Sequence, residues 1–108
     1  MPQIKARNIK KEDLCKISKP LVDELQNMLG CPRDYFTIEL IHSTFIQDGD
    51  VTEGYPYVEI AWFDRGQETQ NKVAKLITSH LQKVGYENVD VFFTLFQKNS
   101  YYENGEHF

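Results

Sequence analysis

The chain has 108 residues, the size of one ordinary domain, and its 41% hydrophobic and 13% aromatic residues are enough for a packed core. The formal net charge of −4 argues against nucleic acid and anionic membrane surfaces as partners, because both require clustered positive charge. No apolar run marks a secretory signal or a membrane span, so we expect a cytoplasmic protein whose two cysteines are thiols.

A strand and a long helix are predicted in the first part of the chain. Residues 2–9 alternate loosely between polar and apolar side chains, which is typical of a strand. Apolar residues then recur at steps of three and four over residues 14–29, and they predict an amphipathic helix with Asn8 as a start signal and Gly30 as the terminating residue. Pro20 falls inside this helix and is expected to kink it.

Three further strands and a second helix are predicted after this helix. Residues 35–47 are rich in β-branched and aromatic types and predict one long strand. Turn residues separate it from a strand over residues 57–63. A helix over about residues 69–84 and a strand over residues 89–97 follow, whereas residues 98–108 are polar and aromatic without a helical or strand period.

The order of strand, helix and strand occurs twice, once after Pro2 and once after Pro56. Two such βαβ units, about residues 2–50 and 56–97, place both helices on one face of a sheet because each crossover is right-handed. We therefore predict a single α+β domain, a two-layer sandwich of a four-stranded mixed sheet and two helices, with a C-terminal tail over residues 98–108. The alternative is a ferredoxin-like sandwich, which has the same order of elements.

The sheet face away from the helices is predicted to be chemically mixed. Alternation along the strands assigns to it a set of charged, polar and aromatic residues: Lys5, Arg7, Glu39, Glu59, Phe92 and Thr94. Such a mixture fits a face that other subunits partly cover, with ion pairs across it.

Two stretches and the Met-Pro start resemble the tautomerase superfamily, which includes macrophage migration inhibitory factor. The stretches are residues 55–70 (YPYVEIAWFDRGQETQ) and residues 101–108 (YYENGEHF). The similarity is greatest to a small bacterial family of unknown function within that superfamily. The resemblance implies a homotrimer whose three sheets surround a central channel. It also implies active sites at the subunit boundaries, where an N-terminal proline catalyses keto–enol tautomerisation.

Pro2 is the candidate catalytic residue once Met1 is removed. An α-amino group titrates near pH 8 in model peptides, and burial in an apolar pocket lowers its pKa because the cationic form is disfavoured. A base whose pKa is near neutrality suits proton transfer at a carbon next to a carbonyl group. The alternative is that Pro2 simply begins a strand, where its missing N–H has no cost.

Arg33 is a candidate for holding a substrate carboxylate, because a guanidinium can bind it through two hydrogen bonds. Macrophage migration inhibitory factor has a lysine where this chain has Cys31, so its mode of substrate binding is not expected unchanged. Arg33 could supply the positive charge, with Arg7 and Arg65 as rivals, or it could be a solvated loop residue.

Six further residues are candidates for the wall of the pocket: Tyr35, Trp62, Phe92, Thr94, His107 and Phe108. Trp62 falls beside the proline in the superfamily pattern but also suits the core. Phe92 and Thr94 match positions that superfamily trimers offer to a neighbouring subunit, although both also suit an ordinary strand. The aromatic tail is expected to dock near a subunit interface or over a pocket, with His107 either acting as an acid or only packing.

Two interpretations of function remain open from the sequence. The first is a tautomerase acting on a small 2-oxo or dienol carboxylic acid, and the second is a non-catalytic trimer that binds a partner or serves a structural role. No metal-ligand spacing, phosphate loop or dinucleotide fingerprint is present, so no metal site and no cofactor are predicted.

Overall fold

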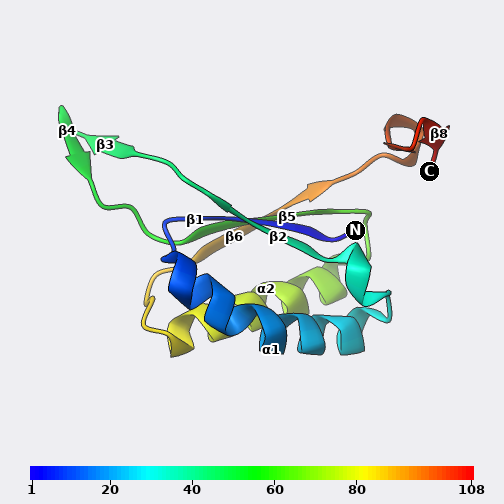
Figure 1. Cartoon of the computed structure of the whole chain (residues 1–108), viewed down its shortest axis with the longest axis horizontal. Coiled ribbons are helices and arrows are strands. Elements are labelled where there is room, and N and C mark those ends of the chain that lie inside the picture. Colours follow the sequence, from blue (N-terminus) through cyan, green and yellow to red (C-terminus); the bar gives the residue numbers. More distant parts are fainter.

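Two strand–helix–strand units follow one another and build one sheet with two helices on one face (Figure 1). The structure is a computed structural model that describes all 108 residues. The first unit contains β1 (Gln3–Arg7), α1 (Lys11–Leu29) and β2 (Thr37–Ile41). The second unit contains β5 (Tyr57–Trp62), α2 (Gln67–Lys83) and β6 (Asp90–Leu95). This is the predicted two-layer α+β sandwich.

The sheet has the strand order β2-β1-β5-β6, so each unit keeps its own two strands side by side. The pairs β1–β2 and β5–β6 are parallel, and the central pair β1–β5 is antiparallel, with Gln3 opposite Ala61 and Arg7 opposite Tyr57. The two units therefore meet along one central strand pair, which makes the sheet mixed. The four strands of the sheet are not interleaved between the units in the ferredoxin-like order.

The helices differ from the sequence prediction mainly at the start of α1. Lys10 is the residue that precedes the helix, whereas Asn8 has a left-handed backbone with φ of 60° and donates a side-chain hydrogen bond to the Tyr55 carbonyl. Asn8 thus makes a turn before the helix and does not cap it. The chain remains helical through Pro20, which is exposed, so water can satisfy the carbonyl that loses its partner. Gly30 ends the helix with φ of 71°, as expected.

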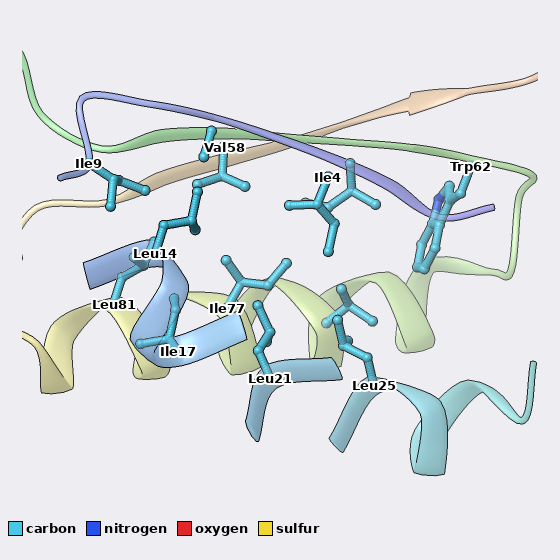
Figure 2. Close-up of a cluster of buried hydrophobic side chains, with 13 residues drawn as sticks. Ile4, Ile9, Leu14, Ile17, Leu21, Leu25, Val58, Trp62, Ile77 and Leu81 are labelled. Carbon is cyan, nitrogen blue, oxygen red and sulfur yellow. The ribbon is translucent and has the colours of Figure 1, made fainter. Parts of the chain in front are cut away.

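The core lies between the sheet and the two helices (Figure 2). The largest side chain in it is Trp62, which is completely buried. Alternate residues of the central strands pack against the apolar faces of the helices, which explains why the period of two in the strands and of 3.6 in the helices predicted this layer. The core residues are Ile4, Ala6, Ile9, Leu14, Ile17, Leu21, Leu25, Val58, Ile60, Trp62, Val73, Ile77 and Leu81.

The prediction of one strand over residues 35–47 is wrong. The strand β2 ends at Ile41, which lies opposite the last residue of β1, so the chain beyond it has no partner in the sheet. It forms a separate hairpin of β3 (Phe45–Gln47) and β4 (Asp50–Thr52). The turn residues Asp48 and Gly49 have φ of 51° and 86°, the left-handed pair that a tight two-residue hairpin requires.

The C-terminal tail also forms regular structure that its sequence period did not predict. After a short 3₁₀ turn, η2 (Lys98–Ser100), it makes a second hairpin of β7 (Tyr102–Glu103) and β8 (Glu106–His107). Both hairpins project from the sheet, one at each end of the molecule (Figure 1). The radius of gyration is accordingly 15.0 Å, compared with about 13 Å for an average compact domain of this length. Neither helix is long and apolar enough to cross a membrane.

Candidate active site

Pro2 lies at the start of β1, where the chain enters the sheet. Its side chain is almost completely buried, and its carbonyl accepts a hydrogen bond from the Thr37 N–H at 3.3 Å. Because Gln3 pairs with Ala61, Pro2 comes next to the end of β5, which carries the buried indole of Trp62. The backbone on both sides therefore fixes the position of the Pro2 nitrogen.

A cavity of about 250 Å³ opens beside the N-terminus. Its walls come from three parts of the chain: the start of β1, the segment from η1 (Arg33–Tyr35) into β2, and the C-terminal tail. Residues Tyr101 to Glu103 of the tail thus lie beside the start of β1. The lining residues are Met1, Gln3, Asp34, Tyr35, Thr37, Tyr101, Tyr102 and Glu103.

Arg65, in the loop between β5 and α2, places a guanidinium group against the Met1 backbone, next to the cavity but not among its lining residues. Its Nη2 atom donates to the Met1 carbonyl at 3.3 Å, and its Cζ atom lies 5.5 Å from the centre of the Trp62 indole ring. The Arg65 Nε atom and the Trp62 Nε1 atom are both buried without a hydrogen-bond partner. A buried donor without a partner is costly, so an acceptor that reached either N–H group would be favourably bound.

The surroundings of the N-terminus lower the pKa of the Met1 amine below its ordinary value of 8.0. Partial burial is the main cause, because it disfavours the cation, and the nearby Arg65 charge acts in the same direction. Cys31, Glu103 and Asp34 oppose this effect and raise the pKa. The amine therefore faces one cation and several acidic groups, and its neutral form gains population near neutral pH.

A family model described as Domain of unknown function (DUF1904) matches residues 1–107. The chain belongs to this family. The crystal structure of a DUF1904 domain from Sebaldella termitidis is 38% identical, covers 100% of both chains and superposes with a TM-score of 0.93. A protein of unknown function from Vibrio cholerae is 31% identical over 99% of this chain and 87% of that chain, with a TM-score of 0.89. No curated protein matches the sequence.

The DUF1904 chain also shares its fold with solved structures of the tautomerase superfamily, as predicted. A macrophage migration inhibitory factor-like protein from Entamoeba histolytica has a TM-score of 0.74 at 19% identity, and the match covers 99% of this chain and 98% of that one. This similarity establishes the architecture, whereas the chemistry of the DUF1904 site has to be argued from its own residues.

Two of the predicted site residues lie at the N-terminal end. Tyr35 lines the cavity and is 45% exposed, whereas Trp62 is a fully buried core residue next to Arg65 and does not line the cavity. Arg33 does not line the cavity: its Nη1 atom binds Asp23 on α1 at 2.6 Å. Hydrogen bonds from Lys19 and Arg33 lower the pKa of the Asp23 carboxyl, so Arg33 already has an anionic partner.

Phe92 and Thr94 lie on β6, on the sheet face away from the helices, and do not reach the cavity. The Phe92 ring packs at 5.0 Å from that of Tyr57, and Thr94 donates a hydrogen bond to Glu59 at 2.7 Å. Phe92 remains 36% exposed on the single chain. A second subunit could therefore still contact this face, which is where the sequence placed a subunit boundary.

His107 and Phe108 belong to the C-terminal hairpin next to the cavity without lining it. The Phe108 ring stacks on Phe63 with centroids 4.9 Å apart and planes inclined by 13°, and Tyr101 packs edge-on against both rings. The His107 ring packs against Tyr102 at 5.4 Å. These contacts fasten the tail beside the N-terminus and hold its residues Tyr101 to Glu103 against the cavity.

Asp34 and Glu103 are the charged cavity residues that the sequence analysis did not select. Glu103 comes just before Asn104 and Gly105, whose φ values of 53° and 79° make the tight turn of the hairpin. An Asn-Gly pair is a strong hairpin signal and could have assigned Glu103 to a short strand. No group of three or more His, Cys, Asp or Glu side chains in the structure could hold a metal ion.

Proposed function

We propose that this chain, once Met1 is removed, is a tautomerase whose N-terminal Pro2 acts as general base on a small 2-oxo or dienol carboxylic acid. The observation that carries the proposal is the combination of an N-terminus beside a cavity and the Arg65 guanidinium behind it with an unpaired, buried Nε donor. Removal of Met1 would free the Pro2 nitrogen and release the Arg65 Nη2 atom from its carbonyl partner.

The proposed reaction is a proton transfer between carbon and the Pro2 nitrogen. Arg65, rather than Arg33, would hold the substrate carboxylate, because Arg33 is engaged by Asp23, whereas Arg65 contacts the carbonyl of Met1, which lines the cavity. The neutral amine would take a proton from the carbon next to the carbonyl group and return it at another carbon. Tyr35 and the tail tyrosines would form the wall against which the organic part of the substrate packs.

A homotrimer is part of this proposal. Three apolar surfaces of the single chain are unusually exposed: the β3–β4 hairpin, the β6 strand and the C-terminal hairpin. Ile46 and Val51 lie directly opposite each other on the first hairpin and are 71% and 76% exposed. Such projecting apolar pairs are typical of surfaces that a second copy covers. A monomeric mass in light scattering would contradict the trimer, and Ile46→Asp should dissociate it.

The proposed compartment is the cytoplasm, and the free thiols of Cys15 and Cys31 are compatible with its reducing conditions. A small carboxylate is the proposed ligand, and neither nucleic acid nor a membrane is proposed as a partner.

The decisive experiment measures ketonisation of enol-phenylpyruvate by untagged protein that mass spectrometry shows to lack Met1. We expect a rate that Pro2→Ala lowers by about tenfold or more, since a positioned general base typically contributes 10²–10⁴-fold and alanine keeps a less suitable primary amine. A rate indistinguishable from buffer, with Met1 shown to be absent, would overturn the enzymatic proposal. It would favour the alternative of a non-catalytic trimer of the same fold.

A further inference from the structure

The cavity at the N-terminus has charged groups of both signs in or next to it. The Met1 amine belongs to a lining residue, and the Arg65 guanidinium lies next to it on the Met1 carbonyl. Asp34, from η1, and Glu103, from β7, supply the negative charge, and both are cavity-lining residues. The only charged side chains that line the cavity are therefore acidic, and the positive charge comes from the amine and the adjacent Arg65.

The position of Glu103 is unfavourable for the hairpin that carries it. Glu103 pairs directly with Glu106 across the β7–β8 ladder, so two carboxylates lie on the same face of a very short hairpin. Like charges at directly opposed positions destabilise a strand pair. Neither carboxylate has an ion-pair partner within 4.0 Å, and of the two only Glu103 reaches the cavity. A role in the cavity explains an acidic residue at position 103, which hairpin stability does not.

We propose that Glu103, together with Asp34, makes the site selective for monoanionic substrates over dicarboxylates. This inference rests on the proposed function, because it concerns the same cavity. A substrate held by its carboxylate at Arg65 extends toward Asp34 and Glu103, where a second carboxylate meets two like charges. A neutral hydroxyl group there can donate a hydrogen bond, and an aromatic or aliphatic end can pack against Tyr35, Tyr101 and Tyr102.

The chain offers a matched control for the test. Glu103→Gln and Glu106→Gln remove the same charge from directly opposed positions of one hairpin, and each relieves the same like-charge pair. Of these two residues, only Glu103 lines the cavity. Any effect through hairpin stability or net charge is therefore common to both variants, and the difference between them reports on the cavity.

The experiment compares kcat/KM for a monoanionic enol acid, enol-phenylpyruvate, with that for a dianionic dienol acid, 2-hydroxymuconate. We expect Glu103→Gln to raise kcat/KM for the dianion by about tenfold or more relative to that for the monoanion, because juxtaposed like charges are strongly unfavourable. Asp34→Asn should act in the same direction, and Glu106→Gln should leave the ratio unchanged. An equal effect of Glu103→Gln and Glu106→Gln, or an unchanged ratio in Glu103→Gln, overturns the inference.

A binding measurement separates this inference from the proposed function. Acylation of the N-terminal amine is followed by mass spectrometry while phenylpyruvate or oxaloacetate protects it. We expect phenylpyruvate to protect the wild-type chain at lower concentration, and Glu103→Gln to reduce that preference. If this protection pattern is observed but turnover that depends on Pro2 is absent, the tautomerase proposal is contradicted and the charge selectivity of the cavity stands. Equal protection by the two acids, or protection by neither, contradicts the charge selectivity.

Discussion

Pro2 and Pro56 precede the two central strands, β1 and β5, at opposite ends of the sheet, and the two ends are built alike. Only the Pro2 end combines a cavity with an amine that can ionise and with buried, unpaired donors. At each end a buried proline begins a strand and its carbonyl accepts a hydrogen bond from the first residue of the neighbouring parallel strand, Thr37 for Pro2 and Asp90 for Pro56. At each end a hairpin with an Asx-Gly turn, Asp48-Gly49 or Asn104-Gly105, projects from the sheet. The repeat therefore extends beyond residue 97, because the tail hairpin is the counterpart of β3–β4.

The ends differ in how their polar groups are satisfied. The hollow at Pro56 is larger, about 530 Å³, and two of its polar side chains, Asn8 and Tyr86, are hydrogen-bonded. The Asn8 amide is held by the Tyr55 carbonyl, and the Tyr86 hydroxyl accepts from the Lys10 N–H and donates to Asp13. At the Pro2 end, the Arg65 Nε and Trp62 Nε1 atoms have no partner. The proposed site is therefore chosen for its unpaired donors next to an amine that can ionise, and not for the size of its cavity.

The largest effect is expected from the prolines themselves. Pro2→Ala should lower kcat/KM for enol-phenylpyruvate by about tenfold or more, whereas Pro56→Ala should change it by less than about threefold, because the Pro56 nitrogen is a non-basic amide in the chain. Steady-state kinetics of both variants, with Met1 removal verified by mass, provides the measurement. Similar losses in the two variants would mean that proline acts here only through the fold.

The two arginines provide the next test. Arg65→Ala should raise KM about tenfold to a hundredfold, since a hydrogen bond to a charged group contributes about 1.5–3 kcal/mol. Arg33→Ala should alter KM by less than about threefold, because the exposed ion pair with Asp23 contributes little. Arg65→Lys should restore KM only in part, since an ammonium group cannot bind a carboxylate through a planar fork. If Arg33→Ala raised KM more than Arg65→Ala, Arg33 and not Arg65 would be the residue that binds the substrate carboxylate.

A third test concerns pH and has no counterpart at Pro56, whose amide nitrogen does not titrate. Only the neutral amine reacts, so acylation of Pro2 should rise with pH and level off above its pKa. Partial burial and Arg65 lower the pKa of the Met1 amine, and we expect the same surroundings to act on the Pro2 amine, so that the half-maximum falls below the value near pH 8 of an exposed α-amine. Arg65→Ala should shift the midpoint up and Glu103→Gln should shift it down. A midpoint above pH 8 would contradict burial of the free amine.

The smallest effects on activity are expected from the hairpin at the Pro56 end. A Cβ atom at Gly54 would overlap the Asn8 side chain and press on Phe45. Gly54→Ala should therefore lower the free energy of unfolding by about 1–3 kcal/mol without changing kcat/KM.

The turn glycine of the C-terminal hairpin, Gly105, lies in open space with φ of 79°. Gly105→Ala should lower the free energy of unfolding by about 1–2 kcal/mol and also weaken the substrate selectivity that Glu103 provides. Chemical denaturation and kinetics on the same samples test both statements.

The sequence predicts the layered core well, because apolar side chains recur with clear periods along both helices and the central strands. It fails where a tertiary partner decides. Residues 42–44 fall inside the stretch predicted as one strand, but β1 ends at Arg7, opposite Ile41, and leaves them unpaired. Likewise, the contact between Arg33 and Asp23 joins two elements, so local sequence could not show that Arg33 is engaged. The position of Arg65 next to the N-terminus is also set by a contact between distant residues, its hydrogen bond to the Met1 carbonyl, which local sequence does not reveal.

The antiparallel pair of β1 and β5 is the seam between the two units, and the helices meet across it, with His80 on α2 contacting Glu24 on α1. Only the short segment before Pro56 joins the units covalently. That segment acts as a tether, and short tethers give effective concentrations in about the millimolar range. A single cut there would leave every contact of the seam in place and turn folding into a bimolecular association. The separated halves should then assemble in a concentration-dependent manner, as two subunits of a dimer do.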